Sequence, residues 1–397
     1  MRRLQVLFFS VLILGAAAPV AAWTTTSGGS SSLNDSQEPG SVLVFHRFQT
    51  GTVTTADQGV QPRTQFELSV VCPKGGTCPN MTPVTLKAHW VCKGVEEGNN
   101  KGFCAETDFE LHTTVNGTLV FNPAGVQPTN VLTPTVKGSP AVPVPPVDCE
   151  EGYLIVWVTD TSGNPIAFDA LIGHAVVREF ANEVHAYNAI PIQAAGGLGE
   201  GPGIDAGAQI GVAGGPLLFD GTMYQAITGK IFGTVRYSGT NSTVRTDLIF
   251  LTLDLNSNRV NDLTSVDLKF FNENEVPHST SISFYCWKEF DPRELDPSLT
   301  SDNPSWGLRG LVKSNAAVQG GNPSTLLGMV ETREGPFIES VEIPDVPVTI
   351  CQYLPVLGFT CLTEVETVTA QFPLVRQYSY LLYNDSEPVA TTFYPND

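Results

Sequence analysis

Short runs in which apolar and polar residues alternate dominate the chain from residue 41 onward. Alternation with a period of two is the pattern of a strand with one buried and one solvated face. In the first half we expect strands at SVLVFHRF (41–48), QFELSVVC (65–72), VTLKAHWV (84–91), TDFELHTTV (107–115), GTLVF (117–121) and GYLIVWVT (152–159). The Asn116-Gly117 pair between two of these runs predicts a hairpin turn, because both residues tolerate positive φ.

The second half shows the same alternation. We expect strands at KIFGTVRY (230–237), TVRTDLIFLTLDL (243–255), SVDLKFF (265–271) and STSISFYCW (279–287), and others near 326–331, 337–343, 346–353, 363–372 and 375–383. One segment has a helical period instead: Ile172, Val176, Phe180 and Val184 recur every four residues behind Asp169, a possible N-cap. The predicted fold is all-β, with two antiparallel β-sandwich, immunoglobulin-like halves and at most one short helix, at 169–187.

The first 22 residues have the pattern of a secretory signal peptide. Arg2 and Arg3 precede an apolar run from 4 to about 14, and Val20 and Ala22 occupy the −3 and −1 positions of a cleavage site before Trp23. The run is shorter than the ~20 residues that span a bilayer, so we expect no transmembrane segment in the mature chain. The predicted location is the cell surface, the periplasm or the extracellular space.

The predicted organisation follows from these patterns and from composition. It is a signal peptide at 1–22, a flexible Ser/Thr/Gly-rich leader at 23–40, a β-sandwich domain at 41–190 with a Pro-rich loop at 122–149, a Gly-rich connector at 191–221 and a second β-sandwich domain at 222–397.

Eight cysteines lie in the predicted mature part, an even number that indicates disulfides in an exported chain. They are Cys72, Cys78, Cys92, Cys104, Cys149, Cys286, Cys351 and Cys361. Short loops lose the least entropy on closing, so we expect bridges 72–78, 92–104 and 351–361 and a long-range bridge between Cys149 and Cys286. A zinc site is the rival interpretation, but the chain has no Cys-x-x-Cys pair.

The net charge argues against a nucleic-acid partner, and the sequence contains few motifs that are typical of a catalytic or metal site. The chain has 40 acidic residues against 21 Lys plus Arg, a net charge of −19, which argues against nucleic-acid binding. No nucleophile elbow or His-Glu-x-x-His motif is present. The segment 254–265 partly fills a calcium loop, with candidate ligands Asp254, Asn256, Asn258 and Asp262, although Arg259 and Ser265 replace its glycine and its bidentate glutamate. An Asx-rich turn explains the same residues.

Two other groups of residues are candidates for a site. If 169–188 is helical, His174, Arg178 and His185 share one face near Glu179 and Glu183, where a metal or acid–base site is an alternative to a solvated surface. Trp90, Trp157, Trp287 and Trp306 are candidate sugar-stacking residues. The first three lie inside strand runs, where core burial is expected, and Trp306 is the one we expect to be exposed.

The segment LIVWVTDTSGNPIAFDALIG (154–173) resembles the strand, turn and return strand of bacterial immunoglobulin-like surface modules. GSVLVF (40–45), CPKGGTCP (72–79) and FYCWKEFDP (284–292) are similar to segments of exported bacterial proteins of unassigned activity. The resemblance implies export and a β architecture and transfers no catalytic residue.

The function expected from the sequence is that of a secreted or cell-surface binding or structural protein without catalysis or a cofactor, whose partner is an extracellular protein or glycan. A secreted carbohydrate-active hydrolase is the first alternative, favoured by the many acids and the tryptophans. A calcium-dependent extracellular module is the second.

Overall fold

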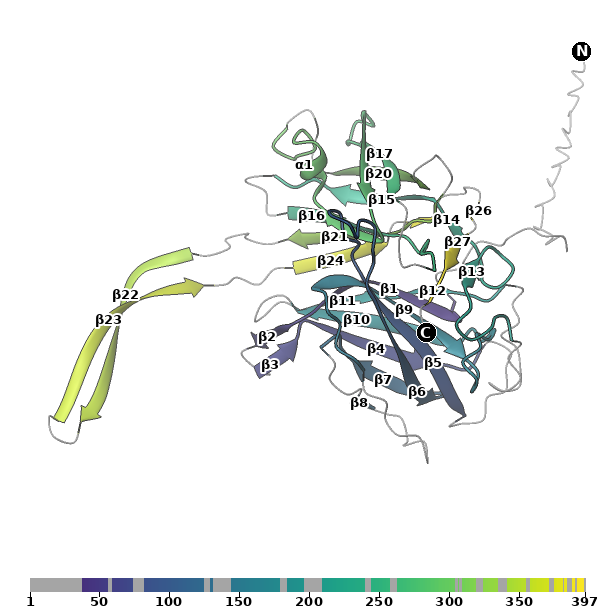
Figure 1. The fold of residues 1–397 in the computed structure, drawn as a ribbon. Coiled ribbons are helices and arrows are strands. Elements are labelled where there is room, and N and C mark those ends of the chain that lie inside the picture. The colour runs from purple at the N-terminus through teal and green to yellow at the C-terminus, as the bar shows by residue number, and fades with distance from the viewer. Residues whose placement is uncertain are drawn as a thin grey trace, which may run out of the picture. The chain divides into compact units, whose positions relative to one another are not determined.

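The computed structural model describes most of the chain after residue 37. The described residues are 38–55, 59–73, 82–124, 129–130, 144–178, 184–195, 209–239, 244–257, 263–303, 306, 309–318, 324–334, 341–354, 358–370, 375–380, 382–383, 388–389 and 391–395. Their secondary structure is almost entirely strand (Figure 1), and the single helix among them is α1 (Pro292–Leu295), of four residues. The all-β prediction is confirmed. Within these ranges, no helix has the length and apolarity needed to cross a bilayer.

Two five-stranded antiparallel sheets come from the first half of the chain. The first has the order β12-β1-β9-β5-β6 and consists of β1 (Val42–Gln49), β5 (Pro83–Cys92), β6 (Glu106–Thr114), β9 (Glu151–Thr159) and β12 (Ile190–Ile192). The second has the order β11-β10-β4-β7-β8 and consists of β4 (Thr64–Val70), β7 (Thr118–Phe121), β8 (Thr129–Asn130), β10 (Leu171–Arg178) and β11 (Val184–Asn188).

Aromatic side chains join these two sheets in one core. The ring of Phe66 on β4 lies 4.9 Å from that of Phe45 on β1 and 5.4 Å from that of Trp90 on β5, centroid to centroid. Along β4 the residues alternate between buried and half-buried, as the sequence pattern predicts. Burial of large aromatic rings is the main stabilising contribution here.

Two further antiparallel sheets come from the second half. One has the order β18-β17-β20-β15-β25 and consists of β15 (Lys230–Arg236), β17 (Thr264–Phe271), β18 (Pro277–Phe284), β20 (Arg309–Val318) and β25 (Leu382–Tyr383). The other has the order β19-β16-β21-β24 and consists of β16 (Val244–Leu251), β19 (Trp287–Phe290), β21 (Leu327–Glu334) and β24 (Val375–Tyr380). A second hydrophobic core, which includes Phe250, Phe270 and Phe284, lies between them.

The remaining strands form two-stranded pairs. These are β2 (Thr52–Thr55) with β3 (Gly59–Pro62), β13 (Leu217–Phe219) with β27 (Thr391–Phe393), β14 (Ile227–Thr228) with β26 (Pro388–Val389), and β22 (Val341–Leu354) with β23 (Gly358–Ala370). Because β13 pairs with β27, part of the predicted Gly-rich connector is bonded to the end of the chain.

Side chains from the second half also enter the core of the first. The larger hydrophobic cluster includes Ile249, Leu251 and Met329 beside the residues of the first two sheets. The indole nitrogen of Trp287 donates to the His46 carbonyl at 2.7 Å, and the Tyr153 hydroxyl donates to the Thr252 carbonyl at 3.3 Å. The division into domains at 191–221 stays a prediction, and so does the immunoglobulin-like grouping of the sheets.

The helix predicted at 169–187 is wrong. Leu171–Arg178 and Val184–Asn188 are the antiparallel strands β10 and β11, with Ala175 opposite Tyr187 and Val177 opposite His185. Residues 179–183 lie outside the described residues. A spacing of four is an even number, so it also keeps residues on one face of a strand, and the pattern did not distinguish the two structures.

The turn at Asn116-Gly117 forms, but it does not close a hairpin. Asn116 has a φ of 64°, and the Gly117 amide donates to the Thr114 carbonyl at 2.8 Å. β6 before the turn and β7 after it belong to different sheets, so the chain crosses from one sheet to the other here. The Asn116 amide donates to the Val70 carbonyl of β4, which positions the crossing.

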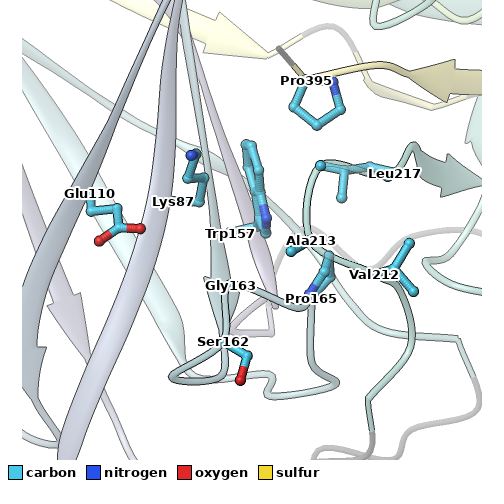
Figure 2. Close-up of a pocket in the computed structure, with 12 residues that line it drawn as sticks. Lys87, Glu110, Trp157, Ser162, Gly163, Pro165, Val212, Ala213, Leu217 and Pro395 are labelled. Carbon is cyan, nitrogen blue, oxygen red and sulfur yellow. The ribbon is translucent and has the colours of Figure 1, made fainter. Parts of the chain in front are cut away.

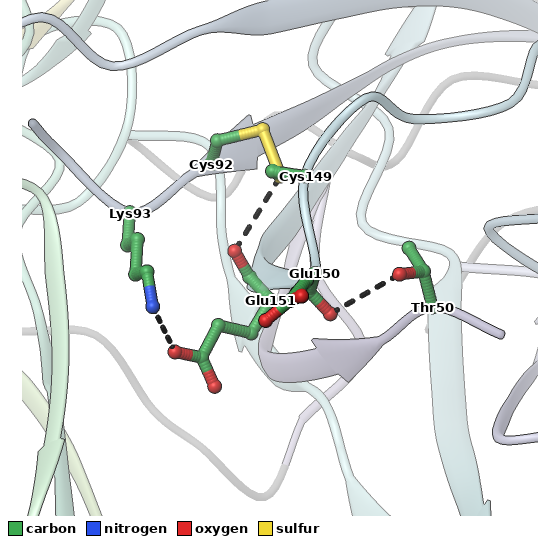
Figure 3. The surroundings of a disulfide bond; sticks show 6 residues. All are labelled: Thr50, Cys92, Lys93, Cys149, Glu150 and Glu151. Atoms are coloured by element: carbon green, nitrogen blue, oxygen red, sulfur yellow. Dashed lines mark hydrogen bonds and ion pairs between the residues drawn. A yellow bond between two sulfur atoms is a disulfide. The ribbon is translucent and has the colours of Figure 1, made fainter.

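Two disulfides are described, and they correct the predicted pairing. Cys92 is bonded to Cys149 and Cys104 is bonded to Cys286, with Cα–Cα distances of 6.0 and 6.5 Å. The expected 92–104 and 149–286 bridges are therefore wrong. Figure 3 shows the Cys92–Cys149 bond where β5 ends and β9 begins, beside the ion pair of Lys93 and Glu151 at 2.5 Å. Loop length misled the prediction because sheet pairing brings distant residues together.

The other two expected bridges stay predictions. Cys72 is disulfide-bonded, and Cys78 lies outside the described residues. Cys351 and Cys361 are directly opposite each other in the register of β22 and β23. That register is the backbone arrangement which a bridge across two antiparallel strands requires.

Replacing both Cys104 and Cys286 by serine should lower the free energy of unfolding by about 2–5 kcal/mol, because their bond closes a long loop in the unfolded chain. Urea unfolding of the oxidised proteins measures the loss. As a control, peptide mapping of the wild type without reductant should recover the 104–286 and 92–149 linked peptides, and a 92–104 peptide would contradict the assignment.

Candidate functional site

Half of the predicted calcium ligands lie in described residues. Asp254 and Asn256 follow β16, and Asn258 and Asp262 lie outside the described residues. The Asp254 amide donates to the Thr252 hydroxyl at 3.2 Å, and the Leu255 amide donates to the Thr392 carbonyl at 3.2 Å. The segment is thus hydrogen-bonded to its own turn and to β27. Calcium binding here stays a prediction.

The predicted His/Arg face forms only in part, because His174 and Arg178 are four residues apart on β10 and share a face of the strand, whereas His185 does not. His174 is half-buried on β10, with its Nε2 3.3 Å from an oxygen of Glu67. His185 is buried and lies opposite the buried Val177. The two imidazoles are therefore on opposite faces of their sheet. Arg178 is buried on β10, and Glu179 and Glu183 lie outside the described residues.

The four candidate tryptophans are all buried. Trp90, Trp157 and Trp287 are core residues as predicted, but Trp306, expected to be exposed, retains only 7% exposure. Its ring lies 5.3 Å from that of Tyr237. None of the four offers a flat exposed ring for stacking a sugar. The hydrolase alternative thus loses the exposed tryptophan that motivated it.

A small pocket forms where the turn at 160–165 meets the loop at 211–217. Figure 2 shows Trp157 and Lys87 on one side and Pro165, Val212 and Leu217 on the other. Its volume of about 150 Å³ is below the ~300 Å³ of common small-molecule sites. The Asn164 amide oxygen accepts the Ala213 amide at 3.0 Å, which fixes the turn against the loop. We interpret this pocket as a packing feature.

An acidic cluster, of which Glu331 is buried and Asp247 and Glu289 are half-buried, is the one candidate metal centre among the described residues. Oxygens of Asp247, Glu289 and Glu331 lie within 4.8 Å of one another. The guanidinium of Arg47, from β1, is bonded to Glu331 at 2.5 Å and to Glu289 at 3.0 Å. Arg47 therefore supplies positive charge to these carboxylates, and the cluster joins β1 to the sheet of the second half.

His46 precedes that arginine and is fully buried. Burial lowers the pKa of its imidazole from 6.5 to about 3, because a charged ring loses its hydration there. The ring is neutral at physiological pH. Its backbone carbonyl, rather than its ring, makes the bond to Trp287.

The strongest candidate binding surface is the outer face of the β18-β17-β20-β15-β25 sheet. Its strands carry one acidic residue, Asp267, and five basic residues. We call this surface the basic face, and it consists of Lys230, Arg236, Lys269, Arg309 and Lys313. Such an excess of positive charge is notable in a chain of net charge −19.

Strand alternation explains how these residues reach one face. On β17, Val266, Leu268 and Phe270 are buried in the second core, so the residues between them point outward. Lys269 is one of those outward residues. The register places it directly opposite Lys313 of β20, so the two lysines share the face.

Two like-charge pairs cross neighbouring strands of this face. Lys269 is opposite Lys313, and Arg236 is opposite Arg309. Like charges in directly opposite positions destabilise a sheet. The Lys313 ammonium lies 5.6 Å from the centre of the Phe271 ring, a weak compensation at an exposed position. An anionic partner lying over Lys269 and Lys313 would relieve the repulsion between these two residues.

The face also has a shape suited to contact. Lys230, Asp267, Lys269 and Lys313 line an open depression of about 480 Å³ together with Ser279. Seryl hydroxyls and lysyl ammonium groups both donate hydrogen bonds to carboxylates. The depression thus offers hydrogen-bond donors and positive charge to an acidic partner, together with some apolar surface.

Sequence reasoning missed this site. The strands containing Lys230 and Lys269 were predicted, but RGLVKSNAAV at 309–318 was not, because its small and polar residues weaken the alternation. Without β20 between them, β15 and β17 have no common register. The sequence therefore does not show that their charged residues lie on one face. A signal was present in the charged residues at alternate positions of KIFGTVR and SVDLKFF.

Comparisons with known proteins give no family. No family model and no curated protein matches the chain. A solved structure of infectious bursal virus derived T=1 particles aligns with 76% of this chain and 65% of that chain, at 7% identity and a TM-score of 0.12. A similarity this low carries no argument about fold or function.

His46 should make the protein sensitive to acid. The unfolded chain protonates this ring near pH 6.5 and the folded chain near pH 3, so the unfolded state holds more protons between these values. The free energy of unfolding should fall as the pH falls through this window, by up to about 1.4 kcal/mol per pH unit from this group. Denaturant unfolding of wild type and H46Q from pH 7 to 4 should show a steeper fall for wild type. Equal slopes for H46Q and wild type would refute the assignment.

Replacing Lys269 by threonine should stabilise the protein, because it removes the repulsion of Lys313. We expect a gain of about 0.5 kcal/mol at low salt that shrinks as salt rises. Thermal unfolding at two ionic strengths measures it. The matched control is K93T, which breaks the Lys93–Glu151 ion pair and should give no gain. A loss of stability in K269T would contradict the opposed-lysine arrangement.

Proposed function

We propose that this protein acts outside the cytoplasm as a non-catalytic binding or structural protein, and that it binds an acidic protein partner through the basic face. The observation that carries the proposal is the pair of opposed lysines, Lys269 and Lys313, in a strongly acidic chain. Repulsion in the free protein is offset when carboxylates approach from solvent.

The disulfides support the proposed location. Bonds such as Cys92–Cys149 and Cys104–Cys286 persist in oxidising compartments and are rare in the cytosol. They agree with the signal peptide expected at 1–22. Two β-sandwich-like halves held by such bonds give a rigid scaffold, and rigid sheet faces lose little entropy on binding.

The composition of the face favours a protein partner over a sugar polymer. Its half-buried Phe271 and Phe232 lie among the lysines, where they offer apolar contact to side chains. Exposed aromatic rings for stacking sugars are lacking at the four buried tryptophans discussed above. Carboxylates of Asp and Glu complement the ammonium and guanidinium groups of the face.

Binding to polyglutamate tests the charge recognition. Fluorescence anisotropy of labelled polyglutamate should show salt-sensitive binding to the wild type, and K230E/K269E/K313E should weaken it at least about tenfold. The repulsion expected from a net charge of −19 makes any binding by the wild type informative.

The matched control changes the net charge by the same amount elsewhere. The variant K93E/K101E/K288E reverses three lysines that lie outside the basic face. It should bind polyglutamate within about twofold of wild type if recognition is local. Absence of wild-type binding, or equal loss in both variants, would overturn the proposal.

A further inference from the structure

The hairpin formed by β22 and β23 is chemically the opposite of the basic face. Its residues 341–370 contain Glu342, Asp345, Glu364 and Glu366 and no lysine or arginine. Two long strands run antiparallel, from Val341 opposite Ala370 to Leu354 opposite Gly358. A hairpin of acidic composition and a basic sheet face thus belong to the same chain.

The hairpin pairs with nothing else in the described part of the chain. β22 and β23 form a sheet of their own (Figure 1), and each bonds only to the other among the described strands. A two-stranded hairpin alone is marginally stable in water, and both of its edges present unpaired backbone groups. A partner surface would stabilise such an element.

The hairpin has features of a preorganised binding element. Cys351 and Cys361 lie opposite each other, at the register position where a cross-strand bridge is expected. A bridge there would hold the strands together before binding and lower the entropy lost on docking. Glu364 and Glu366 are two residues apart on β23, the spacing that puts strand residues on one face, whereas Glu342 is opposite Thr369 in the register and lies on the other face.

We propose that the acidic hairpin of one copy of this protein docks on the basic face of a second copy. The inference rests on the proposed function and identifies the acidic partner as the protein itself. The hairpin has four acidic residues and no lysine or arginine, and the strands of the basic face have five basic residues and one acidic residue. The two elements are therefore complementary in charge. The two surfaces are different patches of the chain, so the contact is heterologous and each copy both gives a hairpin and receives one.

Heterologous contacts produce rings or open chains of copies, depending on whether the rotation between neighbours closes. Association should increase with protein concentration and decrease with salt, because the contact depends on charge. Neutralising either surface should abolish it. Rings or open chains built from copies of this protein would give it a structural role outside the cell.

Sedimentation velocity of the purified, oxidised protein tests the contact. At about 0.05 M NaCl the wild type should associate as its concentration rises, and at about 0.5 M NaCl it should be monomeric. The variants E342Q/D345N/E364Q/E366Q and K230E/K269E/K313E should each stay monomeric at low salt. The K93E/K101E/K288E control should associate like wild type.

A charge swap separates loss of contact from loss of folding. The variant E342K/D345K/E364K/E366K has a basic hairpin, and K230E/K269E/K313E has an acidic face. Each should be monomeric alone, and an equimolar mixture should associate, because both kinds of contact are then complementary. Restored association in the mixture shows that both variants are folded.

The outcomes distinguish this inference from the proposed function. A wild type that is monomeric at low salt, or a mixture that stays monomeric, overturns self-assembly. If polyglutamate still binds the basic face in that case, the proposed function stands and the acidic partner is another protein. A hairpin that folds onto its own basic face gives a concentration-independent monomer and also overturns the contact between copies.

Discussion

The guanidinium of Arg47 is almost fully buried and lies between two carboxylates, one buried and one partly exposed, and this arrangement joins strands from the two halves of the chain. Arg47 comes from β1, whereas Glu331 and Glu289 come from β21 and β19. A buried carboxylate is costly unless a cation and further hydrogen bonds satisfy it. The observed placement of β1 against those strands brings the charges together, and removing Arg47 would leave the buried Glu331 without its cation.

That docking decides which surfaces are left for function. On β16, Ile249 and Leu251 enter the larger core shared with the first half, whereas Leu248 and Phe250 enter the second core. The sheet that contains β16 is therefore buried on both faces, which explains its continuous apolar run LIFL. The neighbouring sheet, with β17 and β20, buries one face only. Its other face is free to carry charge, and the basic face lies there.

Prediction from sequence succeeded where the pattern is local and failed where the fold is not. Alternation identified β1, β4, β5 and β17 because burial of one face depends only on neighbouring residues. The four-residue spacing from Ile172 fits a strand as well as a helix, so β10 and β11 were misassigned. β20 escaped because Gly310, Ser314 and Ala316 blur the alternation. The basic face depends on the order β17-β20-β15, and strand order is set by long-range packing that no single segment encodes.

The interleaved disulfides have a consequence for biogenesis. During synthesis Cys92 and Cys104 emerge together, long before Cys286, and an oxidant joins the thiols that meet first. The native bonds do not join these two early cysteines to each other. Cys92 pairs with Cys149 and Cys104 pairs with Cys286, and both partners are synthesised later. A compartment with oxidising power alone would trap the nearest-neighbour bond. Efficient maturation therefore calls for thiol–disulfide exchange by an isomerase, and the yield of native protein should be limited by reshuffling rather than by oxidation.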